Sequence, residues 1–142
     1  MILLDAYALL ALALDEAVAD EVEEIVRKGG AAISAANFFE VTDHLVRRSK
    51  WTPQDTGERF GLLIGDRVAV IPLDEHVAWN AALLRARHYD RVSCSISLAD
   101  CVLLATAGRG HTIVTADPAV AYVAGAEGID LHPLPDSSGR RP

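Results

Sequence analysis

Short apolar runs alternate along this chain with longer segments of helical periodicity, and this alternation limits the possible folds more than any other feature. The sequence predicts buried strands at residues 1–5, 31–34, 68–71, 111–115 and 129–132. Around and between them it predicts helices at residues 7–14, 16–28, 36–49, 53–63, 74–89, 98–108 and 118–123. Strands that alternate with helices in this way usually form parallel sheets whose faces the helices cover. The expected fold class is therefore α/β, with a mainly parallel central sheet flanked by helices.

The length and composition favour one folded domain followed by a short tail. The chain has 142 residues, 51% of them hydrophobic, which is enough to bury a single core. No internal repeat and no linker between domains is visible in the sequence. We expect the domain to cover residues 1–134. Residues 135–142 are rich in Pro, Ser, Gly and Arg and are expected to form a loose tail.

The apolar N-terminal segment superficially resembles a secretory signal but lacks its basic start. The first basic residue is Arg27, and the apolar part from Ala6 to Leu14 is far shorter than the roughly 20 residues of a membrane span. Cys94 and Cys101 have a spacing that fits no zinc pattern, so we expect both to be thiols in a reducing compartment. The sequence thus predicts a cytoplasmic protein with no membrane segment.

Four acidic residues occupy positions that the predicted sheet brings to one edge. Asp5 ends the first strand, and Asp117 follows the fourth. Asp100 lies in the first turn of the helix before that fourth strand, and Glu40 lies one turn into the helix after the second. Sites in parallel sheets form beyond the carboxyl ends of the strands, so one crevice is able to collect all four acids.

Each acid also has a purely structural explanation. Asp5 and Asp117 are good helix N-caps, and Asp100 completes a capping box with Ser97. Glu40 belongs to a helix face that is also explained as an ordinary solvated surface, which it shares with Asn37, His44 and Arg47. The functional interpretation therefore depends on the four acids lying together, because no single one of them requires it.

Clustered carboxylates point to a particular chemistry. They repel one another and raise each other's pKa, and hard divalent cations with oxygen ligands relieve that repulsion. Two such ions about 3.5–4 Å apart are able to support hydrolysis of a phosphodiester. The formal net charge of −7 disfavours indiscriminate binding of DNA or RNA. It does not exclude a nuclease whose acids are neutralised by bound cations.

The four acids lie in sequence contexts that resemble the PIN-domain ribonucleases, and most closely the VapC toxins of type II toxin–antitoxin pairs. The likeness covers roughly residues 1–134 and rests on LLDAYALLALAL, SAANFFEV, SLADCVLLATA and VTADPAVAYVA. It implies a PIN-like α/β/α sandwich that acts as a metal-dependent endoribonuclease. It also implies that one or two Mg²⁺ or Mn²⁺ ions are bound by Asp5, Glu40, Asp100 and Asp117, and that Thr115 helps to order this catalytic site. The partners it implies are an RNA substrate, a cognate antitoxin protein and a second copy of the chain in a homodimer.

The sequence departs from the family pattern directly after the first acid. The family usually has Thr or Ser there, whereas Ala6 and Tyr7 follow Asp5. A hydrogen bond to the metal ligands or their water is then missing, unless the hydroxyl of Tyr7 replaces it. This departure keeps open an alternative function, a catalytically weakened PIN-like module that binds RNA or protein.

Two basic clusters and two tryptophans each allow two interpretations. Residues 47–50 and residues 85–91 are able to hold RNA phosphates, but solvated helix ends explain them equally well. Trp51 and Trp79 either stack on a base or pack against the protein. The sequence alone leaves these alternatives open.

Overall fold

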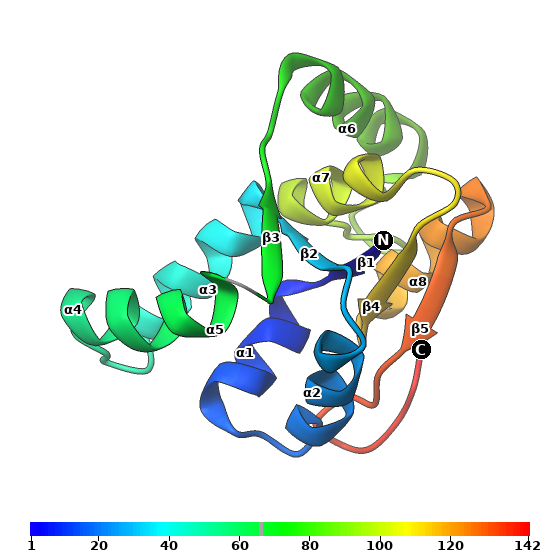
Figure 1. Ribbon diagram of the computed structural model, residues 1–142. Helices are drawn as coiled ribbons and strands as arrows, with labels where there is room; N and C mark the ends of the chain where they lie inside the picture. The colour runs from blue at the N-terminus through cyan, green and yellow to red at the C-terminus, as the bar shows by residue number, and fades with distance from the viewer. Residues whose placement is uncertain (66) are drawn as a thin grey trace.

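The computed structural model describes residues 1–65 and 67–142 and contains a five-stranded sheet whose neighbouring strands are parallel. The strands are β1 (Ile2–Leu4), β2 (Ala31–Ser34), β3 (Val68–Ile71), β4 (Thr112–Thr115) and β5 (Asp130–Pro133). Their order across the sheet is β3-β2-β1-β4-β5, so β1 lies in the centre (Figure 1). The predicted α/β fold class with a parallel sheet is confirmed.

Helices follow the strands and cover both faces of the sheet. They are α1 (Ala6–Leu14), α2 (Ala19–Arg27), α3 (Ala35–Arg47), α4 (Pro53–Asp55), α5 (Gly61–Gly65), α6 (Glu75–His88), α7 (Leu98–Ala107) and α8 (Pro118–Glu127). A π-helical turn, η1 (Thr56–Phe60), connects α4 to α5. Among the described residues, no helix has the length and apolar character needed to cross a membrane.

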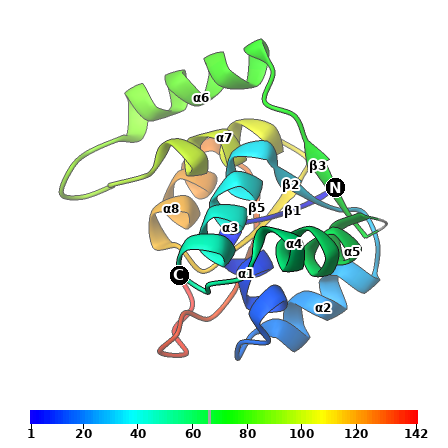
Figure 2. The same cartoon turned by 90° about the vertical axis from the view of Figure 1, so that its left-hand side faces the viewer.

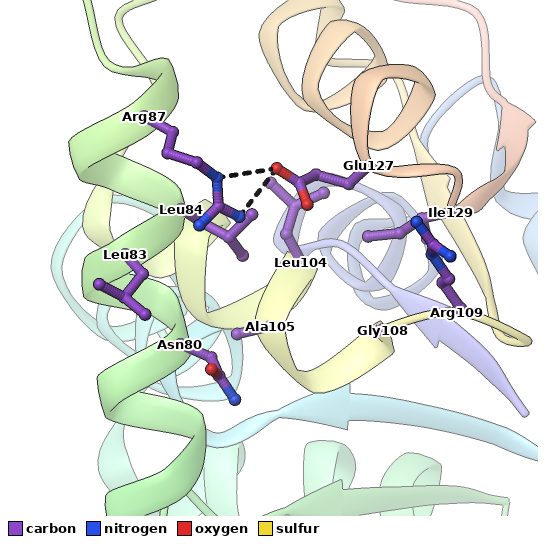
Figure 3. A pocket seen from close by; sticks show the side chains of 10 residues that line it. All are labelled: Asn80, Leu83, Leu84, Arg87, Leu104, Ala105, Gly108, Arg109, Glu127 and Ile129. Atoms are coloured by element: carbon purple, nitrogen blue, oxygen red, sulfur yellow. Dashed lines mark hydrogen bonds and ion pairs between the residues drawn. The ribbon is translucent and has the colours of Figure 1, made fainter.

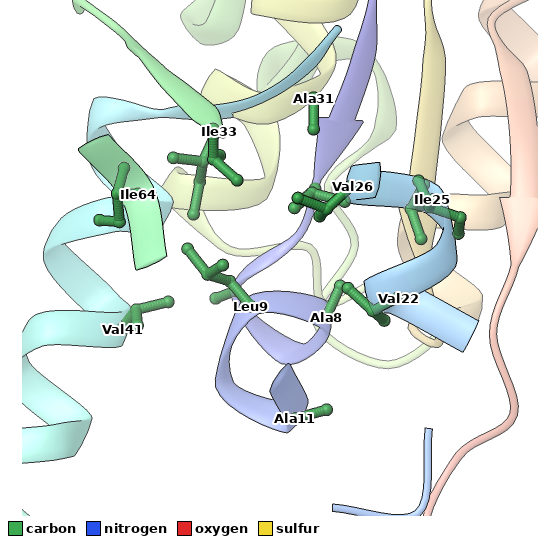
Figure 4. Close-up of a cluster of buried hydrophobic side chains, with 14 of the residues drawn as sticks. Ala8, Leu9, Ala11, Val22, Ile25, Val26, Ala31, Ile33, Val41 and Ile64 are labelled. Carbon is green, nitrogen blue, oxygen red and sulfur yellow. The ribbon is translucent and has the colours of Figure 1, made fainter. Parts of the chain in front are cut away.

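Two hydrophobic clusters, one on each face, hold the helices to the sheet. Successive side chains of a strand point to opposite faces, and β1 shows the consequence. Leu4 packs with side chains of α1, α2 and α3, whereas Leu3 packs with those of α7 and α8. Figure 4 shows part of the first cluster, with Leu9 of α1, Val22 of α2 and Val41 of α3. Cys94 and Cys101 are buried in the second cluster as free thiols, as expected. The predicted α/β/α sandwich is therefore confirmed.

Three helices differ from the sequence prediction by more than two residues, and the first is α2, which begins at Ala19 rather than at residue 16. Residues 53–63 were expected to form one helix, but the chain forms α4, η1 and α5 in succession. Gly57 and Gly61 lie in this stretch and weaken a regular helix, which favours a π-helical turn. Helix α8 runs to Glu127 rather than to residue 123, because Val123 and Ala124 are both buried and Gly128, with a φ of 70°, ends the helix.

Residues 135–142 contain no helix or strand but contact the rest of the chain. The hydroxyl of Tyr7 donates to the carbonyl oxygen of Pro135 at 3.0 Å. The guanidinium of Arg141 pairs with Glu21 of α2 at 3.0 Å, and His132 contacts the same carboxylate at 2.8 Å. The boundary at residue 134 and the loose character of the tail stay predictions.

Candidate active site

Asp5 lies at the centre of the candidate site, between the end of β1 and the start of α1. Only 6% of its surface is exposed. Its Oδ1 accepts a hydrogen bond from the backbone N–H of Ala6 at 2.5 Å, and its Oδ2 accepts one from the hydroxyl of Thr115 at 2.5 Å. The cap that the sequence predicted is therefore present, and it occupies one oxygen of a buried carboxylate.

Burial raises the pKa of Asp5 from 3.8 to about 7, because a desolvated carboxylate resists ionisation. The hydrogen bond from Thr115 opposes this rise, and the negative charges of Asp100 and Asp117 add to it. Asp100 and Asp117 therefore both lie close enough for their charges to act on Asp5. This agrees with the expectation that the carboxyl edge of the sheet collects them.

Thr115 connects two of these acids. It is the last residue of β4 and is fully buried. Its hydroxyl donates to Asp5 and accepts from the backbone N–H of Asp117 at 3.0 Å. A single hydroxyl thus positions both the carboxylate of Asp5 and the backbone at Asp117. This is the arrangement expected of a residue that orders the site.

Asp100 caps its own helix and still faces the site. Its Oδ2 accepts from the backbone N–H of Ser97 at 2.8 Å, while the Ser97 hydroxyl accepts from the N–H of Asp100 at 3.0 Å. This reciprocal capping box is the structural explanation that the sequence offered, and it is confirmed. The cap uses one carboxylate oxygen, so capping does not compete with metal binding at the other.

Asp117 repeats this arrangement at the start of α8, where Pro118 occupies the first helical position. Its Oδ1 accepts from the N–H of Ala119 at 2.6 Å and from that of Val120 at 3.3 Å. The residue is exposed, unlike Asp5. Asp5, Asp100 and Asp117 are therefore all held at helix N-termini, where the positive end of the helix dipole favours negative charge.

Glu40 reaches the same region from α3. Its pKa is raised by partial burial and then by the negative charge of Asp100, while a hydrogen bond from Asn37 opposes the rise. Asn37 itself is fully buried. Its Oδ1 accepts from the Ser34 hydroxyl at 2.5 Å, and its Nδ2 donates to Glu40 at 3.4 Å.

The position of Asn37 corrects one interpretation of the sequence. Asn37 was grouped with Glu40, His44 and Arg47 on a possible solvated face, and a solvated face does not contain a fully buried amide. Asn37 orients Glu40, a role that sequence reasoning missed. The signal available was Ser34 three positions before Asn37, the spacing at which an N-cap hydroxyl contacts the third residue of a helix.

The donor set fits a hard divalent cation. All four predicted ligands offer carboxylate oxygens, the ligand type that Mg²⁺ prefers. No hydrogen bond within residues 1–65 and 67–142 uses Oδ1 of Asp100, Oδ2 of Asp117 or Oε1 of Glu40. As the side chains stand, the described part of the chain has no group of three Asp, Glu, His or Cys side chains close enough to hold an ion. The chemistry of the ligands still fits Mg²⁺, because this ion usually takes only one or two protein carboxylates and keeps waters as its other ligands.

Tyr7 does not replace the missing hydroxyl beside Asp5. Its O–H donates to the carbonyl oxygen of Pro135, so this proton is not directed to the acids. The departure from the family pattern at Ala6 and Tyr7 therefore has no compensation from Tyr7.

Three of the four basic residues in the second basic cluster make contacts within the protein. Arg85 donates to the carbonyl oxygen of Ile96, and its guanidinium lies 4.0 Å from the ring of Tyr89. Arg87 and His88 contact Glu127 at 2.9 Å and 2.6 Å. Figure 3 shows Arg87 and Glu127 at a cavity between α6, α7 and α8. The cavity is lined by none of the four acids, so it is separate from the candidate site.

The comparisons with known proteins agree with this fold. A chain of VapBC2 from Rickettsia felis, in a structure with promoter DNA, is 15% identical, with a TM-score of 0.67 over 93% of this chain and 98% of that one. VapC20 of Mycobacterium tuberculosis, a toxin that cleaves the sarcin–ricin loop, is 16% identical. Its TM-score is 0.68, over 86% of this chain and 94% of that one. FitAcB of Neisseria gonorrhoeae is 20% identical, with a TM-score of 0.64 over 92% of this chain and 96% of that one.

At the level of sequence, no curated protein matches the chain. The family model for the PIN domain does match, over residues 2–126. This range contains β1 to β4 and all four acids of the candidate site. The chain therefore belongs to the PIN domain family.

Proposed function

We propose that this protein is a metal-dependent endoribonuclease that acts in the cytoplasm as the toxin of a toxin–antitoxin pair. The observation that carries the proposal is that Asp5, Asp100 and Asp117 lie together at the carboxyl edge of the sheet, where Thr115 binds Asp5 and the backbone of Asp117 and the charges of Asp100 and Asp117 act on Asp5. Glu40 joins them through its interaction with Asp100. The structural likeness to VapC20, a toxin that cleaves RNA, supports the assignment of substrate and role.

The residues of the site suit a phosphodiester substrate. Helices α1, α7 and α8 all begin at this edge, and their N-termini hold the carboxylates of Asp5, Asp100 and Asp117 that would bind the cations facing the phosphate. Asp100, Asp117 and Glu40 each present one oxygen that capping does not use. Asp5 and Thr115 hold the centre of the site in a fixed arrangement. Bound Mg²⁺ or Mn²⁺ would supply charge stabilisation and activation of the attacking water.

The proposal predicts RNA cleavage that depends on a divalent ion. Protein freed of any antitoxin should cut structured RNA in Mg²⁺ or Mn²⁺ and stop when a chelator is added, because the carboxylates repel one another and the phosphate without cations. Gel analysis of labelled RNA measures this. Cleavage that continues at the same rate in chelator would exclude the metal mechanism.

The alternative function, a binding module with weakened catalysis, gives a different result in the same assay. The feature that favours it is Tyr7, whose hydroxyl bonds to Pro135 rather than to the site. Such a protein would retain labelled RNA in a filter-binding assay in Mn²⁺ but leave it intact. Cleavage with turnover excludes this alternative.

Exposed apolar surface supports the proposed protein partners. Phe38 and Phe60 stack with their ring centroids 5.6 Å apart and line an apolar groove between α3 and η1. Leu62, close by in α5, is 82% exposed. Apolar patches of this kind mark protein–protein contacts. We propose that they serve a homodimer and a cognate antitoxin.

Both partner proposals are testable separately. Co-expression with a small antitoxin encoded directly upstream should suppress toxicity and yield a complex of both chains. An Arg of the antitoxin is able to neutralise the carboxylates without activating water.

Light scattering on the isolated protein should give the mass of a dimer, and a monomeric mass at tens of micromolar would refute the homodimer.

A further inference from the structure

A groove beside the candidate site runs along α3. It is lined by Ala6 and Leu10 of α1 and, on α3, by residues that include Phe39, Glu40, His44 and Arg48. Figure 2 shows α3 on the near side of the molecule, with α1 beneath it. Because Glu40 is also one of the four acids, the groove opens directly onto the candidate site. From Glu40 to Arg48 it extends about 12 Å, at about 1.5 Å per helical residue.

Phe39 is the unusual residue of this groove. It directly precedes Glu40, and 69% of its surface is exposed. Its neighbour Phe38 is partly buried against the core and stacks on Phe60, so packing explains Phe38 but not Phe39. An exposed aromatic ring beside a phosphodiester-cleaving site offers a flat apolar surface on which an unpaired base can stack.

The charges of the groove favour a phosphate at its far end. Arg47 binds both oxygens of Asp43, at 2.6 Å and 2.7 Å, so the charge of Asp43 is largely neutralised. Arg48 is exposed, and in the described part of the chain it has no ion pair or side-chain hydrogen bond. Arg48 and His44 also lie near enough to Asp43 to help hold its pKa below the usual range. A phosphate bound here therefore meets a cation rather than an unpaired carboxylate.

We propose that a single-stranded segment of RNA lies in this groove, with one base stacked on Phe39 and a phosphate beside Arg48. This inference rests on the proposed nuclease function and names the residues that position its substrate. An aromatic ring combined with a cation in one groove is typical of single-strand binding. The apolar groove of Phe38 and Phe60, on another side of α3, is better suited to a protein partner.

Fluorescence anisotropy with a short labelled single-stranded RNA of mixed sequence tests the groove, with chelator present to prevent cleavage. Phe39→Ala should weaken binding about tenfold, within the range expected for loss of one base stack, and Phe39→Trp should retain it. Arg48→Ala should weaken binding and lower the slope of log K against log salt by about 0.7. Tyr122→Ala and Arg109→Ala remove an exposed aromatic ring and an exposed cation elsewhere and should bind as the wild type does.

Cleavage in Mn²⁺ by the same variants separates this inference from the proposed function. If the wild type cleaves, Phe39→Ala should raise KM more than it lowers kcat. If the Phe39→Ala variant binds and cleaves RNA as well as the wild type does, the groove assignment is overturned and the nuclease function is left intact. If the wild type does not cleave, a loss of RNA binding in Phe39→Ala still supports the groove. Loss of antitoxin binding with unchanged RNA binding would show that the groove takes a protein, and would overturn the inference.

Discussion

Asp100→Asn should reduce metal-dependent RNA cleavage about 100-fold or more while the protein stays folded. Loss of a residue that supports a metal ligand already costs about 10–100-fold, and Asp100 is proposed as a ligand itself. Asp100 is the third residue of α7, and Asn at this position keeps an oxygen that is able to accept the hydrogen bond from the backbone N–H of Ser97, so the capping box loses little. Initial rates of cleavage at saturating Mn²⁺ measure the effect, and circular dichroism checks the fold.

Asp74→Asn is the matched control for this substitution. Asp74 is the N-cap of α6, and its Oδ1 accepts from the backbone N–H of Val77 at 2.8 Å. Like Asp100, it accepts a hydrogen bond from a backbone N–H at the start of a helix, but it is absent from the interactions among the four acids. The control should cleave at the wild-type rate. If Asp100→Asn also cleaves normally and binds Mn²⁺ with wild-type affinity in a calorimetric titration, Asp100 is a cap and nothing more.

The sequence predicted the location of the acids because a parallel sheet imposes it. Asp5 directly follows β1 and Asp117 lies two positions after the end of β4, and these two strands pair with each other, so register alone brings both acids to one edge. The position of Asp100 in the first turn of α7 was predictable because Ser97, three residues earlier, forms a capping box with it. These features depend on local sequence and on the order of strands, and both were accessible without a structure.

The supporting contacts were not accessible, because they depend on packing between distant segments. Tyr7 and Pro135 are separated by 128 positions, and Arg87 and Glu127 by 40. No local pattern predicts such pairs. Asn37 illustrates the same limit at short range, since its burial depends on how α3 packs on its neighbours rather than on the periodicity of α3 itself.

Asp5 also makes the stability of the metal-free protein depend on pH in an unusual direction. The pKa of Asp5 in the folded protein is about 7, above its ordinary value of 3.8. Below about pH 4 the carboxyl is protonated in both the folded and the unfolded chain, so its ionisation does not lower the free energy of unfolding. As the pH rises toward 7 the unfolded chain ionises freely while the folded one resists, so stability falls. At about 1.36 kcal/mol per pKa unit, the loss above pH 7 is on the order of 4 kcal/mol.

Asp5→Asn should therefore stabilise the metal-free protein at pH 8, by up to about 4 kcal/mol, and have little effect near pH 4. The amide cannot ionise, and Thr115 is able to accept a hydrogen bond from it in place of the one it donates to Asp5. Urea unfolding of both proteins across this pH range measures the difference.

Saturating Mn²⁺ should reverse the order of stability at pH 8, because the ion favours the charged form of Asp5 and the variant has lost that ligand. A variant that is less stable than the wild type at pH 8 without metal would mean that the bond from Thr115 outweighs the cost of burying the charge. Asp5 is proposed as a metal ligand, so Asp5→Asn should also reduce RNA cleavage. A substitution that weakens activity is then expected to strengthen the metal-free fold, which is the relation between function and stability that a buried acidic site predicts.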